Sequence, residues 1–403
     1  MPDPDRAVSL LPVAKAQARL LALARPVAVE WVELAEAAGR WAAEDVTALR
    51  TQPAVALSAM DGYAIRFADL PGPWTVIGES TAGRAFAGSI GMGEATRIFT
   101  GAVMPDGADS VLVQEEAGRE ASLLRLTGEG PADRGRNTRA RGLDFHAGDR
   151  LIAAGERLTP ARVAVAAIGG HAALPVRRPV RVAIAATGDE LVAPGSRDWS
   201  AASAALPESN GVMLAAMLRD LPVEVVDLGV VPDDLPTMRD AFAGVCADLI
   251  VTTGGASVGD HDLVRPALEA AGGAIDFWRI ALRPGKPMMA GRLGRALVLG
   301  LPGNPVSAFV TALLFVRPVI ARLAGAADPL PRPAPAVLGE YLPANGERTD
   351  YLRAELRDGR AYASTIQDSS MLLTLARATC LIVRAPHAPP ASAGDSAEIL
   401  DLG

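Results

Sequence analysis

The alternation of apolar runs and helical patterns after residue 178 constrains the fold more than any other feature of the sequence. Four runs rich in Val, Ile and Leu are each separated by a segment whose apolar residues recur at helical spacing; the runs are VRVAIAAT, VEVVDLGVV, ADLIVTTGG and RALVLGLPG. Near-continuous apolar strands that alternate with helices form parallel sheets covered on both faces. We therefore predict a three-layer α/β domain with a parallel-rich sheet over residues 178–327.

The rest of the chain has different patterns, which predict a multidomain α/β plus β protein. Residues 1–27 contain an amphipathic helical pattern that we expect to pack against the α/β domain, and residues 28–50 with 147–177 are predicted to form a helical linker domain. Residues 51–146 are dense in Gly, Pro and short strand-like runs, which predicts a β-rich insert domain. After a Pro-rich connector, residues 328–403 carry short alternating strands typical of a small β-barrel or sandwich.

The charge of the chain limits the kind of partner it can bind. With 39 basic and 46 acidic residues, the formal net charge is −7 and the pI is about 5.3. Nucleic-acid binding without sequence preference depends on many Lys and Arg side chains on phosphates, so we expect no nucleic-acid partner. Any anionic ligand must be held by a local basic site.

The cysteines and the N-terminal segment predict a cytoplasmic location. Cys246 and Cys380 lie far apart in apolar stretches, where we expect buried free thiols, and two cysteines with four scattered histidines build neither a disulfide framework nor a zinc site. The N-terminal segment is amphipathic rather than a secretory signal. No uninterrupted apolar stretch reaches about 18 residues, so we expect no membrane span.

The residues that follow the predicted strands are the first candidates for a ligand site, because ligands bind beyond the carboxyl ends of parallel strands. Glycine-rich turns with free N–H groups follow two strands, and carboxylates that suit a hard cation follow three. Each feature alone has a structural explanation, since a glycine-rich turn can simply be a tight turn, and Asp233 or Asp262 can simply cap a helix. Together they indicate a Mg²⁺-dependent phosphate or oxyanion site. The candidates are Glu190, Asp233, Gly254, Gly255, Ser257, Asp262, Pro302, Pro305 and Ser307.

Two basic loops supply the local positive charge that an acidic protein needs for an anion. Arg279, Arg283 and Lys286 lie around a Pro-Gly turn, and the alternative is a solvated basic turn. In the β-rich insert, a basic loop contains Arg139 and Asp144, and an exposed surface loop is an equal alternative. By itself, the Asp61-Gly62 pair of the same insert is typical of a hairpin turn, and the segment around Thr100 is ambiguous.

Seven segments in this order resemble the molybdopterin molybdenumtransferases, the family of bacterial MoeA and the gephyrin E-domain. They are SAMDGYA, TGAVMPDGAD, NTRARGLD, ATGDEL, TTGGASVGDHD, RPGKP and GLPGNPVS. The resemblance covers essentially the whole chain, and its long signatures make it specific. It implies a four-domain, elongated homodimer in which the active cleft lies between the molybdopterin-binding-like α/β domain of one subunit and the β-rich insert of the other.

The resemblance also implies the reaction and the roles of residues. The family inserts molybdenum from molybdate into adenylylated molybdopterin and releases AMP with the help of Mg²⁺. Its acidic cleft positions correspond to Asp61, Glu190, Asp233 and Asp262, of which the last three are the expected Mg²⁺ ligands. The expected substrate-binding residues are Thr100, Arg139, Asp144, Gly254, Gly255, Ser257, Arg279, Arg283, Lys286, Pro302, Pro305, Ser307, Arg353 and Ser369.

The chain departs from the family pattern in two places. Family members often have lysine at the positions of Arg279 and Arg283, so the positive charge is kept but the compact ammonium group is not. The familiar QGS is Gln367-Asp368-Ser369 here, which places a carboxylate beside an expected anion site. An alternative function, a non-catalytic molybdopterin-binding or scaffold protein of the same fold, would not need the acidic residues.

Overall fold

Within residues 10–196, 205–255 and 263–402, which the computed structural model describes, the α/β region is built on a six-stranded sheet. The strand order is β16-β13-β17-β21-β20-β18. The first four strands are parallel, as the sequence pattern predicts, and β20 and β18 run antiparallel to their neighbours. The bounds are β13 (Val180–Thr187), β16 (Val223–Val231), β17 (Leu249–Thr253), β18 (Ala274–Arg279), β20 (Pro287–Leu293) and β21 (Ala296–Leu301).

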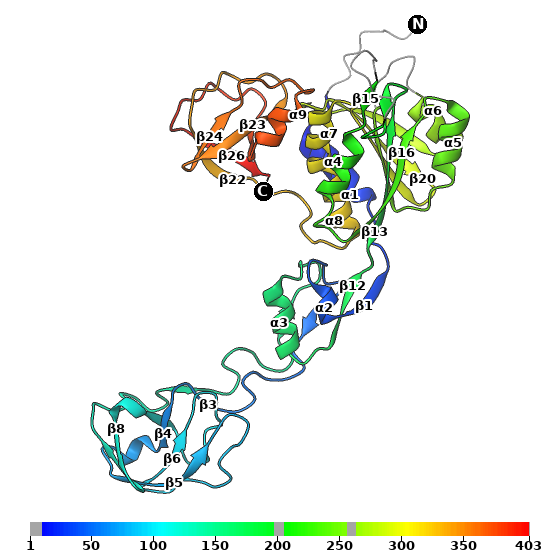
Figure 1. Ribbon diagram of the computed structural model, residues 1–403. Helices are drawn as coiled ribbons and strands as arrows, with labels where there is room; N and C mark the ends of the chain where they lie inside the picture. Colours follow the sequence, from blue (N-terminus) through cyan, green and yellow to red (C-terminus); the bar gives the residue numbers. More distant parts are fainter. Residues whose placement is uncertain (1–9, 197–204, 256–262, 403) are drawn as a thin grey trace.

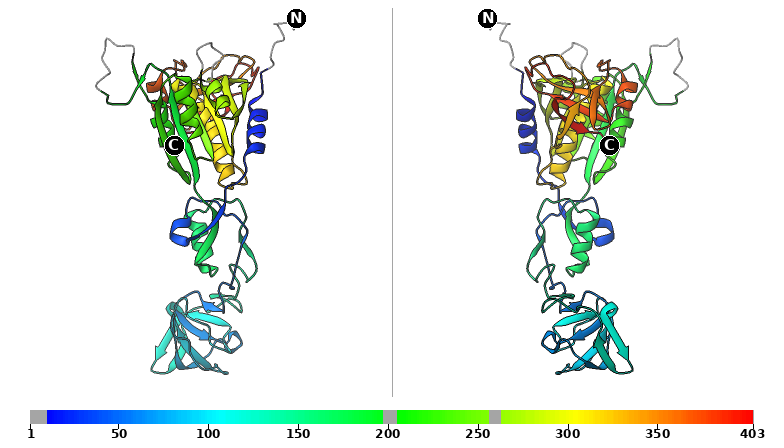
Figure 2. Two further views of the ribbon diagram at one scale, coloured as in Figure 1. Left: turned by 90° about the vertical axis from the view of Figure 1, so that its right-hand side faces the viewer. Right: turned by 90° about the vertical axis from the view of Figure 1, so that its left-hand side faces the viewer.

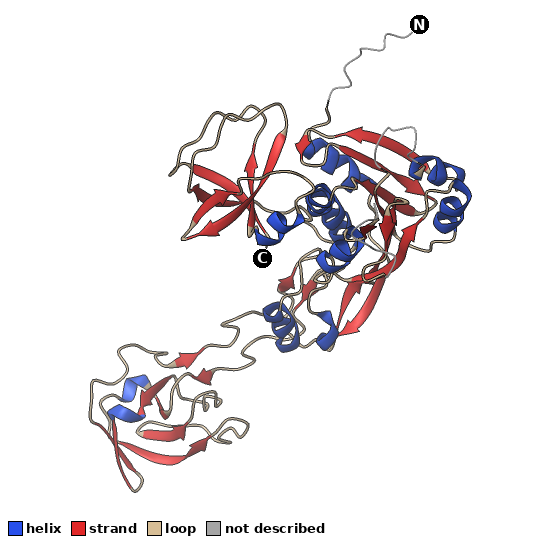
Figure 3. Cartoon of the chain, turned by 45° about the horizontal axis from the view of Figure 1, so that its top comes forward, coloured by secondary structure: helices blue, strands red, loops and turns tan. Residues whose placement is uncertain are grey.

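Helices cover both faces of this sheet (Figure 3), which gives the three predicted layers. α5 (Leu235–Ala243) and α6 (Val264–Ala270) pack on one face, where Phe242 and Leu268 are buried in a common apolar core. The core on the other face contains residues from several helices. These are α1 (Val13–Leu23), α4 (Asn210–Met217), α7 (Pro305–Thr311), the π-helical segment Ala312–Val316 and α8 (Arg317–Leu323).

The helical run Pro305–Leu323 is, among the described residues, the one segment long and apolar enough to cross a membrane. Its most apolar window is 78% buried inside the protein, however. Val310, Phe315 and Ile320 belong to the same apolar core as the sheet. We therefore assign this run as a core helix of the α/β region.

The linker segments form a small mixed unit rather than the helical one that the sequence predicts. Its strands pair antiparallel, β1 with β12 and β2 with β11. The bounds are β1 (Val29–Glu33), α2 (Leu34–Ala37), β2 (Val46–Thr47), β11 (Arg150–Ile152), α3 (Pro160–Ile168) and β12 (Ala173–Arg177).

The α/β region contains a further two-stranded pair, β14 (Leu191–Val192) and β15 (Leu206–Pro207).

The helix expected over residues 29–46 is the main error in the predicted secondary structure. Val29–Glu33 is instead a strand, because β12, far away in the sequence, satisfies its backbone hydrogen bonds. Such a long-range pairing leaves no mark on local periodicity. The local prediction for α3 is confirmed, since the Thr159 side chain accepts a hydrogen bond from the Arg162 N–H (3.3 Å) and Pro160 occupies the first turn.

The insert is β-rich, as predicted, and folds around its own apolar core that contains Trp74 and Leu124. The order of strands in its sheet is β7-β4-β6-β5-β9-β8, and β3 and β10 form a separate pair. The bounds are β3 (Leu57–Ser58), β4 (Gly62–Ile65), β5 (Trp74–Ser80), β6 (Glu94–Ile98), β7 (Ser110–Val113), β8 (Ala117–Glu120), β9 (Leu123–Leu126) and β10 (Thr138–Arg139).

The C-terminal part is a closed five-stranded barrel, which confirms the barrel over the sandwich. Closure follows because β23 pairs with both β24 and β25. A strand from the α/β region, β19 (Leu282–Arg283), adds to β23 in parallel. The bounds are β22 (Ala334–Leu338), β23 (Thr349–Arg357), β24 (Arg360–Ala363), α9 (Leu372–Arg377), β25 (Cys380–Arg384) and β26 (Ser396–Asp401).

One of the two cysteines is placed differently from the prediction. Cys380 is buried in the barrel core, but Cys246 is exposed, and both are free thiols. Cys246 lies in the turn after α5, and the buried strand that follows begins only at Leu249. The apolar sequence around Cys246 therefore extends beyond the segment that the fold buries.

The molecule is elongated, with the insert at one end and the α/β region beside the barrel at the other (Figures 1 and 2). The linker unit lies between the two ends.

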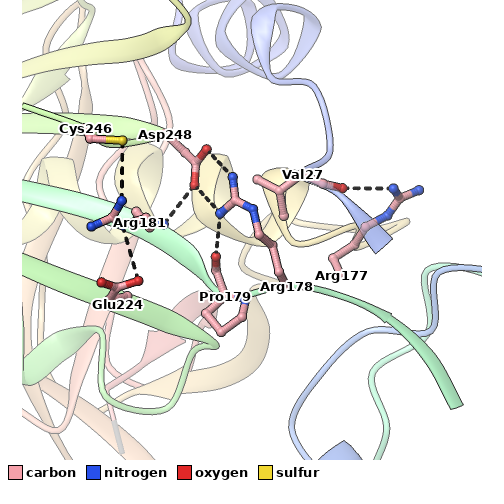
Figure 4. A network of polar contacts seen from close by, with 8 residues as sticks. All are labelled: Val27, Arg177, Arg178, Pro179, Arg181, Glu224, Cys246 and Asp248. Atoms are coloured by element: carbon pink, nitrogen blue, oxygen red, sulfur yellow. Dashed lines mark hydrogen bonds and ion pairs between the residues drawn. The ribbon is translucent and has the colours of Figure 1, made fainter. Parts of the chain in front are cut away.

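Polar contacts fix the point where β12 of the linker continues into β13 of the sheet (Figure 4). Arg178 donates two hydrogen bonds to the Asp248 carboxylate, each 2.8 Å long, and Asp248 also accepts from the Arg181 N–H at 2.9 Å. Arg177 donates to the Val27 carbonyl (2.9 Å). Burial raises the pKa of Asp248, but the hydrogen bonds from Arg178 and Arg181 outweigh it, so the pKa lies below its ordinary value of 3.8.

Replacement of Arg178 by alanine is expected to lower the free energy of unfolding by about 2 kcal/mol at neutral pH, because a charge-assisted bidentate pair is lost. The pKa of Asp248 is depressed in the folded state, so the stabilisation is complete above the ordinary pKa of 3.8 and disappears as the pH falls through the lower folded pKa. Urea unfolding measured at several pH values tests this. The exposed Arg295, replaced in the same way, is the control, and an equal loss in both variants would contradict the assignment.

Candidate active site

A cleft of about 840 Å³ lies at the carboxyl ends of the four parallel strands. The loops that follow β13, β16, β17 and β21 all contribute to it, so the topology brings together residues that are far apart in the sequence. Among the lining residues from these loops are Thr187, Gly188, Glu190, Asp233, Thr253, Gly254, Gly255, Gly303, Asn304 and Pro305.

Gly254 allows two of these loops to approach each other. Its φ is +91°, and a Cβ atom there would lie 2.5 Å from the Thr187 carbonyl oxygen. The Gly254 N–H donates to the Leu301 carbonyl at 3.2 Å. Any side chain at residue 254 would push the loop after β17 away from the end of β13, so the glycine-rich turn shapes the cleft.

The carboxylates in the cleft lie close enough to influence one another. The Asp233 N–H donates to an Asp189 carboxylate oxygen at 2.9 Å, which ties the loops after β16 and β13 together. Burial raises the pKa of Asp233, the negative charges of Asp189 and Glu190 raise it further, and a hydrogen bond from the Asp189 backbone only partly opposes this. The site therefore concentrates negative charge that a bound cation would stabilise.

Two of the expected cleft residues, Ser257 and Asp262, lie outside the described residues. Across the described part of the chain, no three Asp, Glu, His or Cys side chains are grouped as a metal site. Glu190 and Asp233 both line the cleft and are the described oxygen donors among the three predicted Mg²⁺ ligands.

The basic loop lies between β18 and β20 beside α7, and its three cations differ in their surroundings. All three are exposed, but Arg283 also forms an ion pair with the buried Asp350 of the barrel. A Cβ at Gly285 would contact the Thr311 side chain, so the loop packs against α7. The structure thus uses Arg283 to join the barrel to the α/β region, a role that the sequence does not reveal.

Arg353 and Ser369 position a loop rather than line the cleft. Arg353 is 1% exposed and donates to the carbonyls of Ile366 (3.2 Å) and Met371 (3.1 Å). The Ser369 carbonyl accepts from the Val306 N–H at 3.1 Å, which docks this loop on the start of α7. Burial lowers the pKa of Arg353, although the nearby carboxylate of Asp368 opposes the effect.

Three predicted substrate-binding residues lie in α7 or just before it. Ser307 is buried within α7 and Pro302 is buried just before it, and neither lines the cleft, whereas Pro305 does. Asp368 accepts hydrogen bonds from the backbone (2.8 Å) and hydroxyl (2.6 Å) of Ser370. The unusual carboxylate at residue 368 therefore shapes the loop that presents Ser370 to the cleft.

Asp61 and Thr100 form one polar cluster at the edge of the insert. The Asp61 carboxylate accepts hydrogen bonds from the Thr100 N–H (2.7 Å) and hydroxyl (2.8 Å), and these bonds lower the pKa of Asp61. The hairpin-turn interpretation of Asp61-Gly62 is wrong, because Gly62 begins β4 between β6 and β7. A Cβ at Gly62 would lie 2.0 Å from the Leu112 carbonyl oxygen, which explains the glycine.

Arg97, which no sequence motif indicates, supports this cluster. Its guanidinium lies over the rings of Tyr63 and Phe99, with distances of 5.2 and 4.7 Å to the ring centroids. It also donates to the Gly62 carbonyl (3.0 Å) and to the Gln114 side chain (2.7 Å). Arg97 therefore anchors the residue that follows Asp61, and its cross-strand register with Tyr63 becomes visible only in the folded sheet.

Arg139 and Asp144 are exposed on the same insert. In one chain the insert lies at the opposite end of the molecule from the α/β region and its cleft (Figure 1). The structure therefore divides the predicted site residues into two groups. One group lies in and around the cleft, and the other lies on the insert.

Comparison with known proteins identifies the class of this architecture. Residues 11–170 match the MoeA N-terminal region (domain I and II), residues 183–322 a probable molybdopterin binding domain, and residues 335–402 the MoeA C-terminal region (domain IV). The fold and the cleft thus define a multidomain enzyme of the molybdopterin-binding class.

Individual relatives are similar to this protein over most of its length. The chain is 37% identical over 307 residues to the molybdopterin molybdenumtransferase of Haemophilus influenzae, covering 74% of each chain. It is 33% identical to molybdopterin molybdenumtransferase 2 of Mycobacterium tuberculosis, covering 96% of this chain and 97% of that protein. A crystal structure of the molybdopterin biosynthesis moeA protein from Pyrococcus horikoshii OT3 superposes with a TM-score of 0.84 at 26% identity, covering 98% and 100% of the two chains.

The chain belongs to the molybdopterin molybdenumtransferase family and is a transferase of molybdenum cofactor biosynthesis. This membership confirms the family that the sequence motifs indicate and favours the enzyme over the scaffold alternative.

Proposed function

We propose that this protein inserts molybdenum from molybdate into adenylylated molybdopterin in the cytoplasm and releases AMP in a Mg²⁺-dependent reaction. The observation that carries the proposal is the cleft itself, which combines glycine loops after β17 and β21 with the carboxylates Glu190 and Asp233. Backbone N–H groups suit phosphate oxygens, and carboxylates suit the cation that accompanies them. The thiolates of the substrate are the nucleophiles, so the protein needs no nucleophile of its own.

The described donors fit a magnesium ion. Mg²⁺ is commonly held by one or two carboxylates together with water and substrate phosphates, and Glu190 and Asp233 provide two. Asp262 remains the expected third ligand. When bound, the ion would neutralise charge at the phosphoanhydride. The raised pKa of Asp233 supports this assignment, because a cation would compensate the clustered negative charge.

Molybdate is proposed to bind near the basic loop and α7. Lys286 and Arg279 are exposed there, while Arg283 is engaged with Asp350. Arg353 donates to neutral carbonyls and to the Gln367 amide oxygen, so its positive charge would attract an oxyanion to this side of the cleft, although the nearby Asp368 carboxylate weakens that attraction. Ser307 and Ser369 remain expected substrate-binding residues.

The proposed active unit is a homodimer. Asp61, Thr100, Arg139 and Asp144 lie on the insert, at the end of the molecule opposite the α/β region that holds the cleft (Figures 1 and 2). Residues so placed can act on a ligand in the cleft only if the insert of a second copy supplies them. In that arrangement Asp61, held rigidly by Thr100, would help to position the metal ion or a water molecule at the phosphoanhydride.

Release of AMP from adenylylated molybdopterin is the direct test of this function. We expect release to require both molybdate and Mg²⁺. Parallel reactions without molybdate and without Mg²⁺ are the controls. No release with all components present would contradict the transferase reaction and favour a protein that binds molybdopterin without chemistry.

The two lysines of the chain, Lys15 and Lys286, provide a matched test of the anion site. All 37 other basic residues are arginines, and both lysines are exposed. Lys286→Arg is expected to lower the rate of AMP release about tenfold, because a planar fork replaces a compact ammonium beside the oxyanion. Lys15→Arg, on α1, should leave the rate unchanged, and equal rates for both variants would remove Lys286 from the site.

A further inference from the structure

The cleft contains a second group of polar residues that neither the motifs nor the proposed chemistry uses. Glu208 and Asn210 both line it, and each is only 8% exposed. Thr253, also in the lining, is 1% exposed. Buried polar side chains are normally paired, so the partners of these three residues show whether the group is structural.

Only one of the two polar groups of the Asn210 side chain has a hydrogen-bond partner among the described residues. Its side-chain N–H₂ donates to the Gly303 carbonyl at 2.7 Å, which fixes the orientation of the amide. The amide oxygen on the other side is buried and has no hydrogen-bond partner among the described residues, and the same is true of the Thr253 hydroxyl oxygen. A role in packing alone would not explain these atoms, because an unpaired buried polar atom destabilises the fold.

Glu208 supplies a buried carboxylate two residues before Asn210 in the sequence. One of its oxygens accepts from the Gly211 N–H at 2.6 Å, and the second has no protein donor among the described residues. The backbone N–H of Glu208 donates to the Val192 carbonyl (2.8 Å), which holds this segment against the neighbouring strand. The carboxylate and the Asn210 amide therefore offer acceptor atoms in a fixed arrangement.

Apolar side chains lie in the same cleft. Leu206 and Leu372 line it from the α/β region and from the barrel, and they are 56% and 36% exposed. Exposed leucines beside buried acceptors suit a planar ring, whose faces are apolar and whose edge is polar.

We infer that Glu208, Asn210 and Thr253 form a subsite for the N–H edge of a 2-amino-4-oxopteridine ring. A carboxylate pairs with two adjacent N–H donors, and this ring presents them side by side at its 2-amino group and N3. Adenine presents its amino group between ring acceptors, so a carboxylate and an amide oxygen match it less well. The inference rests on the proposed function, because it identifies which part of the pterin substrate each side of the cleft holds.

Binding of two fluorescent ring compounds to the full chain tests the subsite without turnover. Pterin carries the 2-amino group, and lumazine carries an oxygen acceptor in its place. We expect the wild-type protein to bind pterin about tenfold more tightly than lumazine, the usual effect of one charge-assisted hydrogen bond. In Glu208→Gln, whose amide oxygen can still accept from Gly211, the preference should fall to about one, while the affinity for AMP stays unchanged.

Controls separate this outcome from a damaged fold. Glu120→Gln, at the exposed end of β8 in the insert, should keep the wild-type preference for pterin. Thr253→Val, which keeps the side-chain shape, should weaken pterin binding less than Glu208→Gln does. An unchanged preference in Glu208→Gln would overturn the subsite, as would equal binding of the two compounds or no binding of pterin up to its solubility limit.

The subsite and the proposed reaction fail in different ways. Pterin binding that depends on Glu208 without any release of AMP would retain the subsite and remove the transferase reaction. Release of AMP, together with a preference for pterin that does not change in Glu208→Gln, would retain the transferase reaction and remove the subsite.

Discussion

Asp233→Asn is expected to lower the rate of AMP release about 100-fold, the loss commonly seen when one preorganised electrostatic contact is removed from an active site. Asp233 lies in the cleft beside Asp189 and Glu190, where its carboxylate is one of two described oxygen donors for the proposed cation. The amide has nearly the same shape but carries no charge, so Mg²⁺ affinity should fall with the rate. Initial rates measured over a range of Mg²⁺ concentrations test this.

Asp276→Asn is the matched control, because Asp276 is exposed on β18, away from the cleft lining. It should behave like the wild-type protein. A wild-type rate and an unchanged Mg²⁺ requirement in Asp233→Asn would show that Asp233 does not hold the cation.

A mixed dimer of Asp61→Asn and Asp233→Asn chains is expected to recover activity that neither variant has alone. In the proposed homodimer, each site combines the cleft of one chain with the insert of the other. One site of the mixed dimer therefore contains both substitutions, and the other site contains neither. Mixed dimers purified through two different affinity tags should reach about half of the wild-type rate.

The homodimers of each variant are the controls, and each should be about 100-fold slower than the wild-type protein. A mixed dimer as slow as both parents would show that the insert does not act across the subunit boundary. A wild-type rate in the Asp61→Asn homodimer would remove Asp61 from the reaction altogether.

Local sequence patterns predict the elements that depend on local energetics. The apolar runs at Val180–Thr187 and Leu249–Thr253 are strands because both faces of each are buried, and that requirement is visible in composition. The cap at Thr159 and the proline after it predict α3 for the same reason. The helical pattern over residues 29–46 gives a wrong prediction, because the strand Val29–Glu33 is stabilised by pairing with β12, which lies far along the chain.

The candidate site likewise has one part that the sequence predicts and another part that depends on tertiary contacts. The sequence places Glu190, Asp233 and Gly254 after parallel strands, and the topology of such sheets brings them to one edge. The roles of other residues depend on contacts between distant segments. Arg283 pairs with Asp350 in the barrel, Arg353 holds the loop that contains Ser369, and Arg97 anchors the strand after Asp61.

The sequence by itself therefore determines the family, the parallel-rich sheet and the edge of the sheet where ligands bind, because these follow from local patterning and strand order. The tertiary structure alone decides which polar atoms of the cleft have no partner in the described part of the chain, as is the case for the Asn210 amide oxygen. It also decides that the insert lies at the opposite end of the molecule from the α/β region. Both depend on packing between segments that are distant in the chain, and local sequence carries no record of those contacts.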